Sequence, residues 1–175
     1  MTDLRYPIGE FSFEGSNSED QRLRLMDQIA ETPARLREAV KDLSPEQLDT
    51  PYRPAGWTVR QVVHHVSDSH MNGYARFKLA LTEDQPTIKD YRENRWAELV
   101  DARTAPIETS LALLESLHHR WVMMLRSLAP DQFARTFHHP ELGLVSLDYN
   151  LSDYAWHGRH HVAHITSLRE RMGWR

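Results

Sequence analysis

Apolar residues recur along most of the chain at alternating steps of three and four, which is the spacing of one face of an α-helix. Four long segments carry this pattern, at about 18–43, 58–83, 107–128 and 146–172. Four long amphipathic helices predict an all-α fold, a four-helix bundle with long connecting loops. The repeat is clearest in the last segment, where it runs through Leu147, Leu151, Tyr154, Gly158, His161, Ile165, Leu168 and Met172.

Several helix ends are marked in the sequence. Ser18 and Thr58 each begin a capping box, with a glutamine three residues later, and Pro45 favours the first turn of a short helix after Ser44. Gly173 fits a helix C-cap. Pro33 falls inside the first long helix, so we expect a kink near residues 31–32 or two abutting helices.

The segments between the helices differ in length. We expect residues 1–17 to form an extended arm and residues 49–56 and 131–145 to form loops. Residues 84–106 form a long connection with a helical turn around 94–99; it either covers the mouth of a site or contacts a second subunit. No linker or repeat divides the chain, so residues 1–175 are expected to form one domain.

Composition excludes several classes of protein. Asp and Glu outnumber Lys and Arg by 25 to 21, which gives no electrostatic footprint for nucleic acid or an anionic membrane. No apolar run is long enough to span a bilayer, and the start lacks the apolar region of a signal peptide, so we expect a soluble cytoplasmic protein. Cysteine is absent, which excludes disulfides, thiolate metal sites and a cysteine nucleophile.

Eleven histidines are the anomaly of the composition. His157 and His161 are four residues apart, about 40° around a helix, so both imidazoles can reach one metal ion. His160 and His164 form a second such pair, rotated about 60° away. His161 lies on the interior seam, which favours the first pair, and Gly158 indicates a close approach to the helix there. The alternative is that these histidines are surface residues or hydrogen-bonded core groups.

A third ligand is expected from a facing helix. His65 lies on a half-polar stripe that continues through Ser69 and Asn72, a pattern that suits a cavity wall better than a sealed core. His64 points about 100° away, toward the outside. His118, on the apolar seam of its own helix, is the main rival or a partner of a ligand. The full set of candidates on the two helices is His64, His65, His70, His118 and His119.

Several segments resemble the DinB-like superfamily, most closely its YfiT group. They are GWTVRQVVHHVSDSH at 56–70, YAWHGRHHVAHI at 154–165, YPIGE at 6–10 and DTPYRP at 49–54, and the resemblance covers nearly the whole chain. It implies a four-helix bundle and a homodimer. It also implies one divalent metal per chain, zinc in the first place and nickel as the alternative, held by His65, His157 and His161. His164 stands where many relatives have Gln, which implies that it is not a ligand.

The same resemblance implies an enzyme, because the group is described as metal-dependent hydrolases and is related to bacillithiol S-transferases. Three neutral imidazoles leave an open coordination position, where bound water or thiol is activated. The family favours a metal-bound thiolate that transfers a small thiol, bacillithiol, to an electrophilic substrate. A metal-bound hydroxide that hydrolyses a substrate is the alternative. A metal-stabilised bundle that only binds a ligand or partner is the third hypothesis.

No catalytic side chain is identified by the sequence; the metal-bound water or thiolate is expected to react. Metal-bound histidines usually donate their other ring N–H to a carboxylate or carbonyl, and Asp153 and Asp68 are the nearby candidates. Arg76, Arg159 and Trp57 are candidates for the cavity wall.

Overall fold

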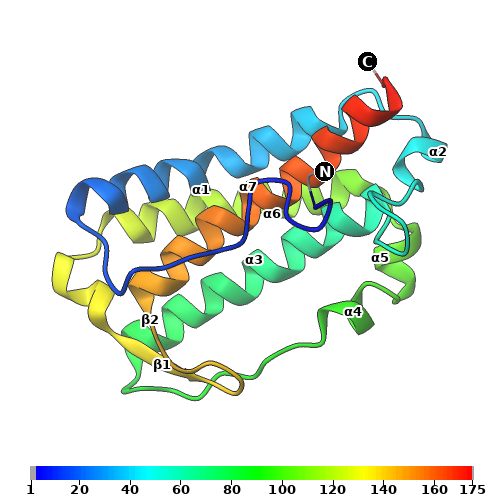
Figure 1. Cartoon of the computed structure of the whole chain (residues 1–175). Helices are drawn as coiled ribbons and strands as arrows, with labels where there is room; N and C mark the ends of the chain where they lie inside the picture. Colours follow the sequence, from blue (N-terminus) through cyan, green and yellow to red (C-terminus); the bar gives the residue numbers. More distant parts are fainter. Residues whose placement is uncertain (1–2, 175) are drawn as a thin grey trace.

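The computed structural model describes residues 3–174 and confirms the four-helix bundle (Figure 1). Its long helices are α1 (Glu19–Val40), α3 (Val59–Thr82), α6 (Ile107–Arg126) and α7 (Leu147–Met172). α1 and α3 each pack against both α6 and α7. In Figure 1, α1 and α7 run in one direction while α3 and α6 run in the other. Of the four helix–helix contacts, α1–α7 and α3–α6 are therefore parallel, and the other two are antiparallel.

This topology explains the long connection after α3. Because α3 and α6 are parallel neighbours, the chain must return along the bundle before α6 can begin (Figure 1). The return segment contains two short helices, α4 (Glu93–Trp96) and α5 (Val100–Thr104). The helical turn expected around residues 94–99 corresponds to α4, whereas α5 was not predicted. With so few residues in α5, no helical repeat is visible in the sequence.

The predicted helix ends are confirmed. Ser18 and Thr58 each accept a hydrogen bond from the backbone of the glutamine three residues later, and the glutamine side chain accepts one in return. The short helix α2 (Pro45–Leu48) begins in the same way after Ser44. Gly173 caps α7 with a φ of 66°, a left-handed conformation that glycine adopts without steric cost.

The structure differs in part from two expectations about irregular segments. α1 is one continuous helix through Pro33, so the alternative of two abutting helices was wrong. Residues 131–145 were expected to be loop, but they contain the 3-10 helix η1 (Pro130–Ala134) and an antiparallel pair, β1 (Thr136–His139) and β2 (Gly143–Ser146). Phe137 pairs with Val145 in that sheet and both are buried. A strand of four residues contains only one or two inward-facing apolar positions, so the apolar–polar alternation that marks a strand is not recognisable in the sequence.

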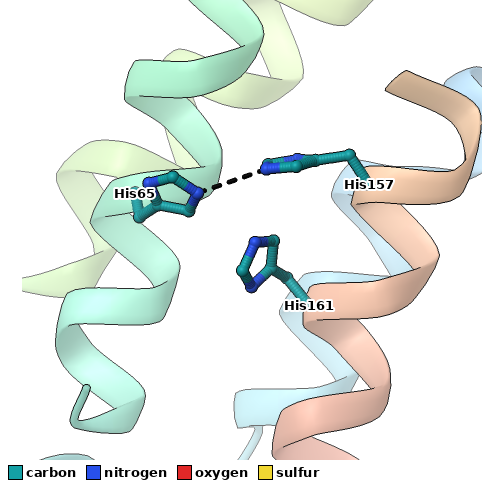
Figure 2. Close-up of side chains that lie close together, drawn as sticks. All are labelled: His65, His157 and His161. Atoms are coloured by element: carbon teal, nitrogen blue, oxygen red, sulfur yellow. Dashed lines mark hydrogen bonds between the residues drawn. The ribbon is translucent and has the colours of Figure 1, made fainter. Parts of the chain in front are cut away.

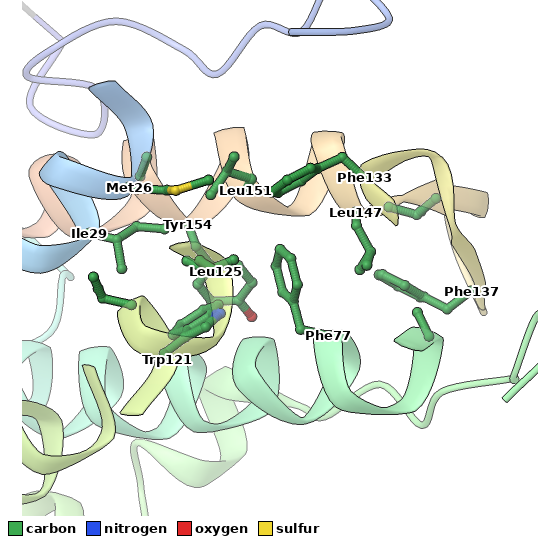
Figure 3. Close-up of a cluster of buried hydrophobic side chains, with 14 of the residues drawn as sticks. Met26, Ile29, Phe77, Trp121, Leu125, Phe133, Phe137, Leu147, Leu151 and Tyr154 are labelled. Atoms are coloured by element: carbon green, nitrogen blue, oxygen red, sulfur yellow. The ribbon is translucent and has the colours of Figure 1, made fainter. Parts of the chain in front are cut away.

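The core consists of two apolar clusters separated by a polar layer. One cluster fills the end of the bundle near the strands and is drawn in Figure 3; it includes Ile29, Phe77, Trp121 and Leu151. The other fills the opposite end, around residues such as Leu36, Val63, Leu114 and Ile165. Between them every long helix contributes buried polar side chains, namely Thr32, His65, His70, His118, His161 and His164. These buried histidines thus lie across the middle of the bundle.

Among the described residues, every helix is too short or too polar to cross a bilayer.

Candidate metal centre

Three histidines, two of them buried and His157 half-buried, converge between α3 and α7 (Figure 2). His65 projects from α3, and His157 and His161 project from successive turns of α7. The Nε2 atoms of His65 and His157 are 3.2 Å apart, and each of the three rings offers a nitrogen within 4.8 Å of the others. Zinc–nitrogen bonds of about 2.0–2.1 Å place two tetrahedral ligands about 3.4 Å apart, so the His65–His157 spacing fits one ion as it stands. The His161 ring lies near enough to complete the group after a small adjustment. The structure therefore brings together the three histidines that the sequence favoured.

Burial keeps these imidazoles neutral. Desolvation lowers the pKa of His65 to about 3 and lowers the pKa values of His157 and His161 well below 6.5. The neighbouring histidines lower them further, because positive charges repel one another. A neutral imidazole keeps a lone pair on one nitrogen, which is the form that binds a metal ion.

Trp57 packs against two of the ligand rings, and Thr32 packs against the helix that carries His157 and His161. The Trp57 indole lies against His65, with ring centroids 4.5 Å apart, and is stacked at 6.4 Å from His161. On the other side of α7, Gly158 meets Thr32 of α1; a Cβ at Gly158 would lie 2.6 Å from the Thr32 Oγ1 atom. The close approach expected at this glycine is thus made by α1.

A cavity of about 320 Å³ opens beside the three histidines. Its remaining wall is mostly polar and is formed by Trp57, Ser69, Arg76, Asp90, Tyr91, Glu93, His139, Asp153 and Tyr154. Arg76 lies 3.6 Å from Asp90, which also faces His139 at 3.7 Å. A larger cavity of about 500 Å³ between α1 and α6 contains none of the three histidines. A small molecule in the smaller cavity would therefore contact both the histidines and charged groups.

The return segment between α3 and α6 lines the mouth of this cavity. It contributes Asp90, Tyr91 and Glu93 to the wall. This favours the expectation that the segment covers the mouth of a site over the expectation that it contacts a second subunit. Side chains of α3 hold the segment: the Gln61 amide donates to the Ala97 carbonyl at 2.7 Å, and His64 lies 3.1 Å from the Ala105 carbonyl. No sequence signal marked the residues that the segment supplies, because they lie outside any periodic pattern.

His64 was expected to point outward, and this was wrong. The side chain is buried, and its Nδ1 atom lies 2.7 Å from the Ser110 hydroxyl. The reason is α5, which packs on the outer face of α3 and turns an outward position into an interior one. His64 is separate from the cluster of three histidines, and so is His119, which is exposed on α6.

The second predicted pair also lies inside the protein. His160, His161 and His164 are all buried and offer nitrogens within 4.8 Å of one another. This group shares His161 with the first one, and His164 already contacts the Arg5 carbonyl through Nε2 at 3.0 Å. We therefore consider the group of His65, His157 and His161 the stronger candidate.

The carboxylates expected beside the ligand rings are elsewhere. The outer nitrogen of His157 faces His70 at 3.1 Å, and that of His161 faces His164 at 3.3 Å. Asp153 instead lines the cavity, where burial raises its pKa to about 6 although Arg76 opposes this. Burial likewise raises the pKa of Asp68 to about 6, but Asp68 is not part of the cavity wall.

Of the three residues proposed for the wall, Arg76 and Trp57 are there and Arg159 is not. Arg159 is exposed, and its side chain donates to the Ala155 carbonyl of its own helix.

Comparison with known proteins agrees with the fold. The family model of the DinB superfamily matches residues 28–165. A Bacillus mycoides protein named "putative metal-dependent hydrolase" is 57% identical over 174 residues, which cover 99% of this chain and 100% of that protein. A Bacillus cereus protein with the same name is 56% identical over 174 residues, which again cover 99% of this chain and 100% of that protein.

Two solved structures are also similar. YfiT from Bacillus subtilis, described as a probable metal-dependent hydrolase with an unusual four-helix bundle topology, has a TM-score of 0.97 and 51% identity, covering 99% of this chain and 100% of that one. The four-helix bundle protein TT2238 has a TM-score of 0.55 at 20% identity, covering 81% and 94%, and supports the fold alone. The chain therefore belongs to the DinB superfamily and to its YfiT group.

Proposed function

We propose that this protein is a metal-dependent enzyme that binds one divalent ion through His65, His157 and His161. The convergence of three neutral imidazoles on one cavity, with His65 and His161 buried and His157 half-buried, carries the proposal. Within residues 3–174, no fourth side chain joins this group of ligand atoms. Three protein ligands with an open position are typical of catalytic zinc sites, whereas structural zinc sites have four. Zinc is our first choice of ion and nickel the alternative, because imidazole suits both.

When bound, a divalent ion here supplies a Lewis acid that lowers the pKa of a coordinated water or thiol. The chain's own residues supply the rest of the site. Trp57 shields His65 from water, and the Arg76 guanidinium provides a cation for an anionic group of a substrate. The Asp153 carboxylate, whose pKa burial raises to about 6, is our candidate for the acceptor of the nucleophile's proton.

For the reaction itself, we propose transfer of a small thiol to an electrophilic carbon. A carbon–sulfur bond forms and the thiol proton goes to Asp153. With an alkyl halide the carbon–halogen bond breaks and halide ion leaves; with an epoxide the carbon–oxygen bond breaks and the ring oxygen takes the proton from Asp153. Bacillithiol is the thiol that the family resemblance implies, and its carboxylates suit the Arg76 side chain in the cavity wall. The chain has no cysteine, so the electrophile meets no competing thiol of the protein.

Hydrolysis at the same site is the second candidate, because the Bacillus relatives are named as hydrolases. Water would then be the nucleophile and Asp153 would accept its proton. The two reactions share all three ligands, so substitution of a ligand does not separate them. A metal-stabilised bundle without activity is the third hypothesis.

Identification of the nucleophile decides among these three. Zinc-loaded protein is incubated in ¹⁸O-labelled water with bacillithiol and a panel of alkyl halides, epoxides and esters, with glutathione as a competing thiol. Mass spectrometry is expected to show bacillithiol conjugates that disappear in the His161→Ala protein. Products that carry only ¹⁸O, with thiol acting as an inhibitor, would replace thiol transfer by hydrolysis. Zinc binding with neither product would favour the inactive bundle.

A further inference from the structure

We propose that two chains of hydrogen bonds between histidines fix the tautomers of His157 and His161, so that both Nε2 lone pairs face His65. Each chain ends on a backbone carbonyl, which sets the direction of every hydrogen bond in it. This inference rests on the metal centre proposed above. It assigns His70, His118 and His164 as positioning residues, which act through the ligands and do not contact the substrate.

The first chain runs from α7 through α3 and α6 to α1. The Nδ1 atom of His157 lies 3.1 Å from Nε2 of His70, and Nδ1 of His70 lies 2.8 Å from Nε2 of His118. The Nδ1 atom of His118 lies 2.6 Å from the carbonyl oxygen of Ile29. We name this set the His118 relay.

The Ile29 carbonyl gives the His118 relay its direction. A carbonyl only accepts, so the proton of His118 is on Nδ1 and its Nε2 accepts from His70. His70 then has its proton on Nδ1 and accepts at Nε2 from His157. The proton of His157 is thus on Nδ1, and its Nε2 is left with a lone pair. That Nε2 atom is the one that lies 3.2 Å from His65.

Pro33 explains why this carbonyl is available. In an α-helix the carbonyl of Ile29 accepts from the N–H four residues later, which belongs to position 33. Proline has no N–H, so the helix leaves the Ile29 oxygen without that partner. The His118 side chain takes the place of the missing donor. The proline inside α1 therefore has a function in this relay instead of breaking the helix.

The second chain, the His164 relay, is shorter and ends on the N-terminal arm. The Nε2 atom of His164 lies 3.0 Å from the Arg5 carbonyl, so it carries the proton. Its Nδ1 atom, 3.3 Å from Nδ1 of His161, must then accept. His161 has its proton on Nδ1 and its Nε2 lone pair free. Tyr52 holds the His164 ring by packing against it, with centroids 4.0 Å apart.

Burial makes the reverse direction costly. If His157 carried its proton on Nε2, each bond of the His118 relay would turn around and leave a His118 lone pair against the Ile29 oxygen. His70 has no exposed surface and His118 is 2% exposed, so water does not reach them to compensate. The same reversal in the His164 relay would place a lone pair against the Arg5 oxygen. The metal-binding tautomers are thus selected before an ion arrives.

Long-range ¹H–¹⁵N spectra of metal-free protein with ¹⁵N-labelled histidine test this directly, because they show which ring nitrogen carries the proton. We expect protons on Nδ1 of His70, His118, His157 and His161, and on Nε2 of His164. A proton on Nε2 of either His157 or His161 would overturn the corresponding relay. The spectra need no catalytic activity, so the relays and the proposed reaction can fail separately.

Paired variants test the consequence for binding, by competition of zinc with a chromophoric chelator. Partners of metal-bound histidines typically contribute about 10- to 100-fold to metal affinity. His118→Met removes the acceptor for His70 and is expected to weaken zinc binding at least about 10-fold, whereas His118→Gln keeps an oxygen acceptor and stays within about threefold. His164→Leu and His164→Asn form the matching pair for the second relay.

Equal zinc affinity within each pair would contradict the inference. Thermal unfolding of the metal-free variants identifies any variant that fails to fold. If one fails, the ¹H–¹⁵N spectra of the unsubstituted protein, which show the tautomers directly, decide whether that relay exists. Expected tautomers in a protein that binds no zinc would refute the metal centre and leave the hydrogen-bond relays established.

Discussion

Gly158 and Thr32 touch where α7 crosses α1, so closely that a Cβ on Gly158 would lie 2.6 Å from Oγ1 and 2.7 Å from Cγ2 of Thr32. The contact lies in the polar layer of the bundle. Gly158 directly follows His157 and precedes His161 by three residues, so the spacing of these two helices also sets the position of two proposed ligands. A glycine here permits an approach that any other residue would prevent.

Gly158→Ala is therefore expected to destabilise the protein. Alanine favours a helix by about 1 kcal/mol over glycine, but forcing a methyl group into a packed interface costs about 1–3 kcal/mol. We expect a net loss of about 1 kcal/mol in urea unfolding and weaker zinc binding. The double variant with Thr32→Ala should recover part of both losses. A Gly158→Ala protein that is more stable than the unsubstituted protein would contradict this prediction, because it would show that α1 and α7 accommodate the methyl group without strain.

Loss of one proposed ligand should abolish stoichiometric metal binding. His161→Ala removes a buried imidazole from the group of three, and two remaining histidines hold an ion far more weakly. Elemental analysis after dialysis is expected to show about one zinc per chain in the unsubstituted protein and little in the variant. His138→Ala, at an exposed histidine of β1, is the matched control and should keep its metal. Full retention of metal in His161→Ala would refute the assignment.

Asp153→Asn should lower activity while metal binding persists. The asparagine side chain has nearly the same shape but cannot take up a proton, and removal of a general base typically costs about 10²–10⁴-fold in rate. Asp84→Asn, on the exposed part of the return segment, is the control. We expect the loss in kcat with zinc content unchanged. Equal activity of the two variants would remove Asp153 from the proposed reaction.

The buried ion pair of Arg22 and Asp148 is expected to stabilise the junction of α1, α7 and the N-terminal arm. The two side chains meet at 2.7 Å, and Asp148 also accepts from the Asn17 backbone. Burial alone would raise the pKa of Asp148, but these bonds outweigh it and hold the pKa below its usual value. Arg22→Ala should therefore cost about 3 kcal/mol at pH 7, because it leaves a buried carboxylate without its partner.

The pH dependence of the stability lost in Arg22→Ala follows from the lowered pKa of Asp148. A lowered pKa in the folded state gives stability that is present above about pH 4, the usual value of Asp, and is lost as the pH falls through the folded-state value. The difference between Arg22→Ala and the unsubstituted protein should shrink correspondingly in acid. Arg24→Ala, at an exposed position, is the control. A difference that does not change with pH would contradict the role of the ion pair.

The long helices and their starts could be predicted from local rules. The three-and-four spacing and the capping boxes at Ser18 and Thr58 depend only on residues close in sequence, and the structure contains both. The apolar helix faces favoured His157 and His161 and left His65 and His118 as rivals for the third position, and the family resemblance implied the full set of His65, His157 and His161. The functional role of the three histidines remains a prediction that metal analysis will test.

Contacts between distant segments could not be predicted in the same way. His64 is buried because α5 covers α3, and the strands β1 and β2 are too short to show a pattern. Pro33 showed that a helical hydrogen bond is missing but not that His118, far along the chain, supplies a donor to the free carbonyl. Such partners depend on how the helices pack, which a linear pattern does not contain.

The buried histidines should make the metal-free protein sensitive to mild acid. Burial lowers the pKa of His118 to about 4 and of His65 to about 3, whereas in the unfolded chain both are near 6.5. The unfolded state therefore binds more protons, and stability is fully present above about pH 6.5 and falls as the pH decreases toward the folded-state values.

His118 gives this prediction its sharpest test. A shift from 6.5 to about 4 corresponds to about 3 kcal/mol, lost progressively between these pH values. Urea unfolding of metal-free protein at pH 7.5, 6.5, 5.5 and 4.5 should show this decline. His118→Gln, which does not titrate, should have a shallower slope, while His138→Ala, at an exposed histidine, should keep the original slope. Identical slopes for the His118→Gln and unsubstituted proteins would show that His118 takes up its proton as readily in the bundle as in the unfolded chain, contrary to its burial between α1, α3 and α6.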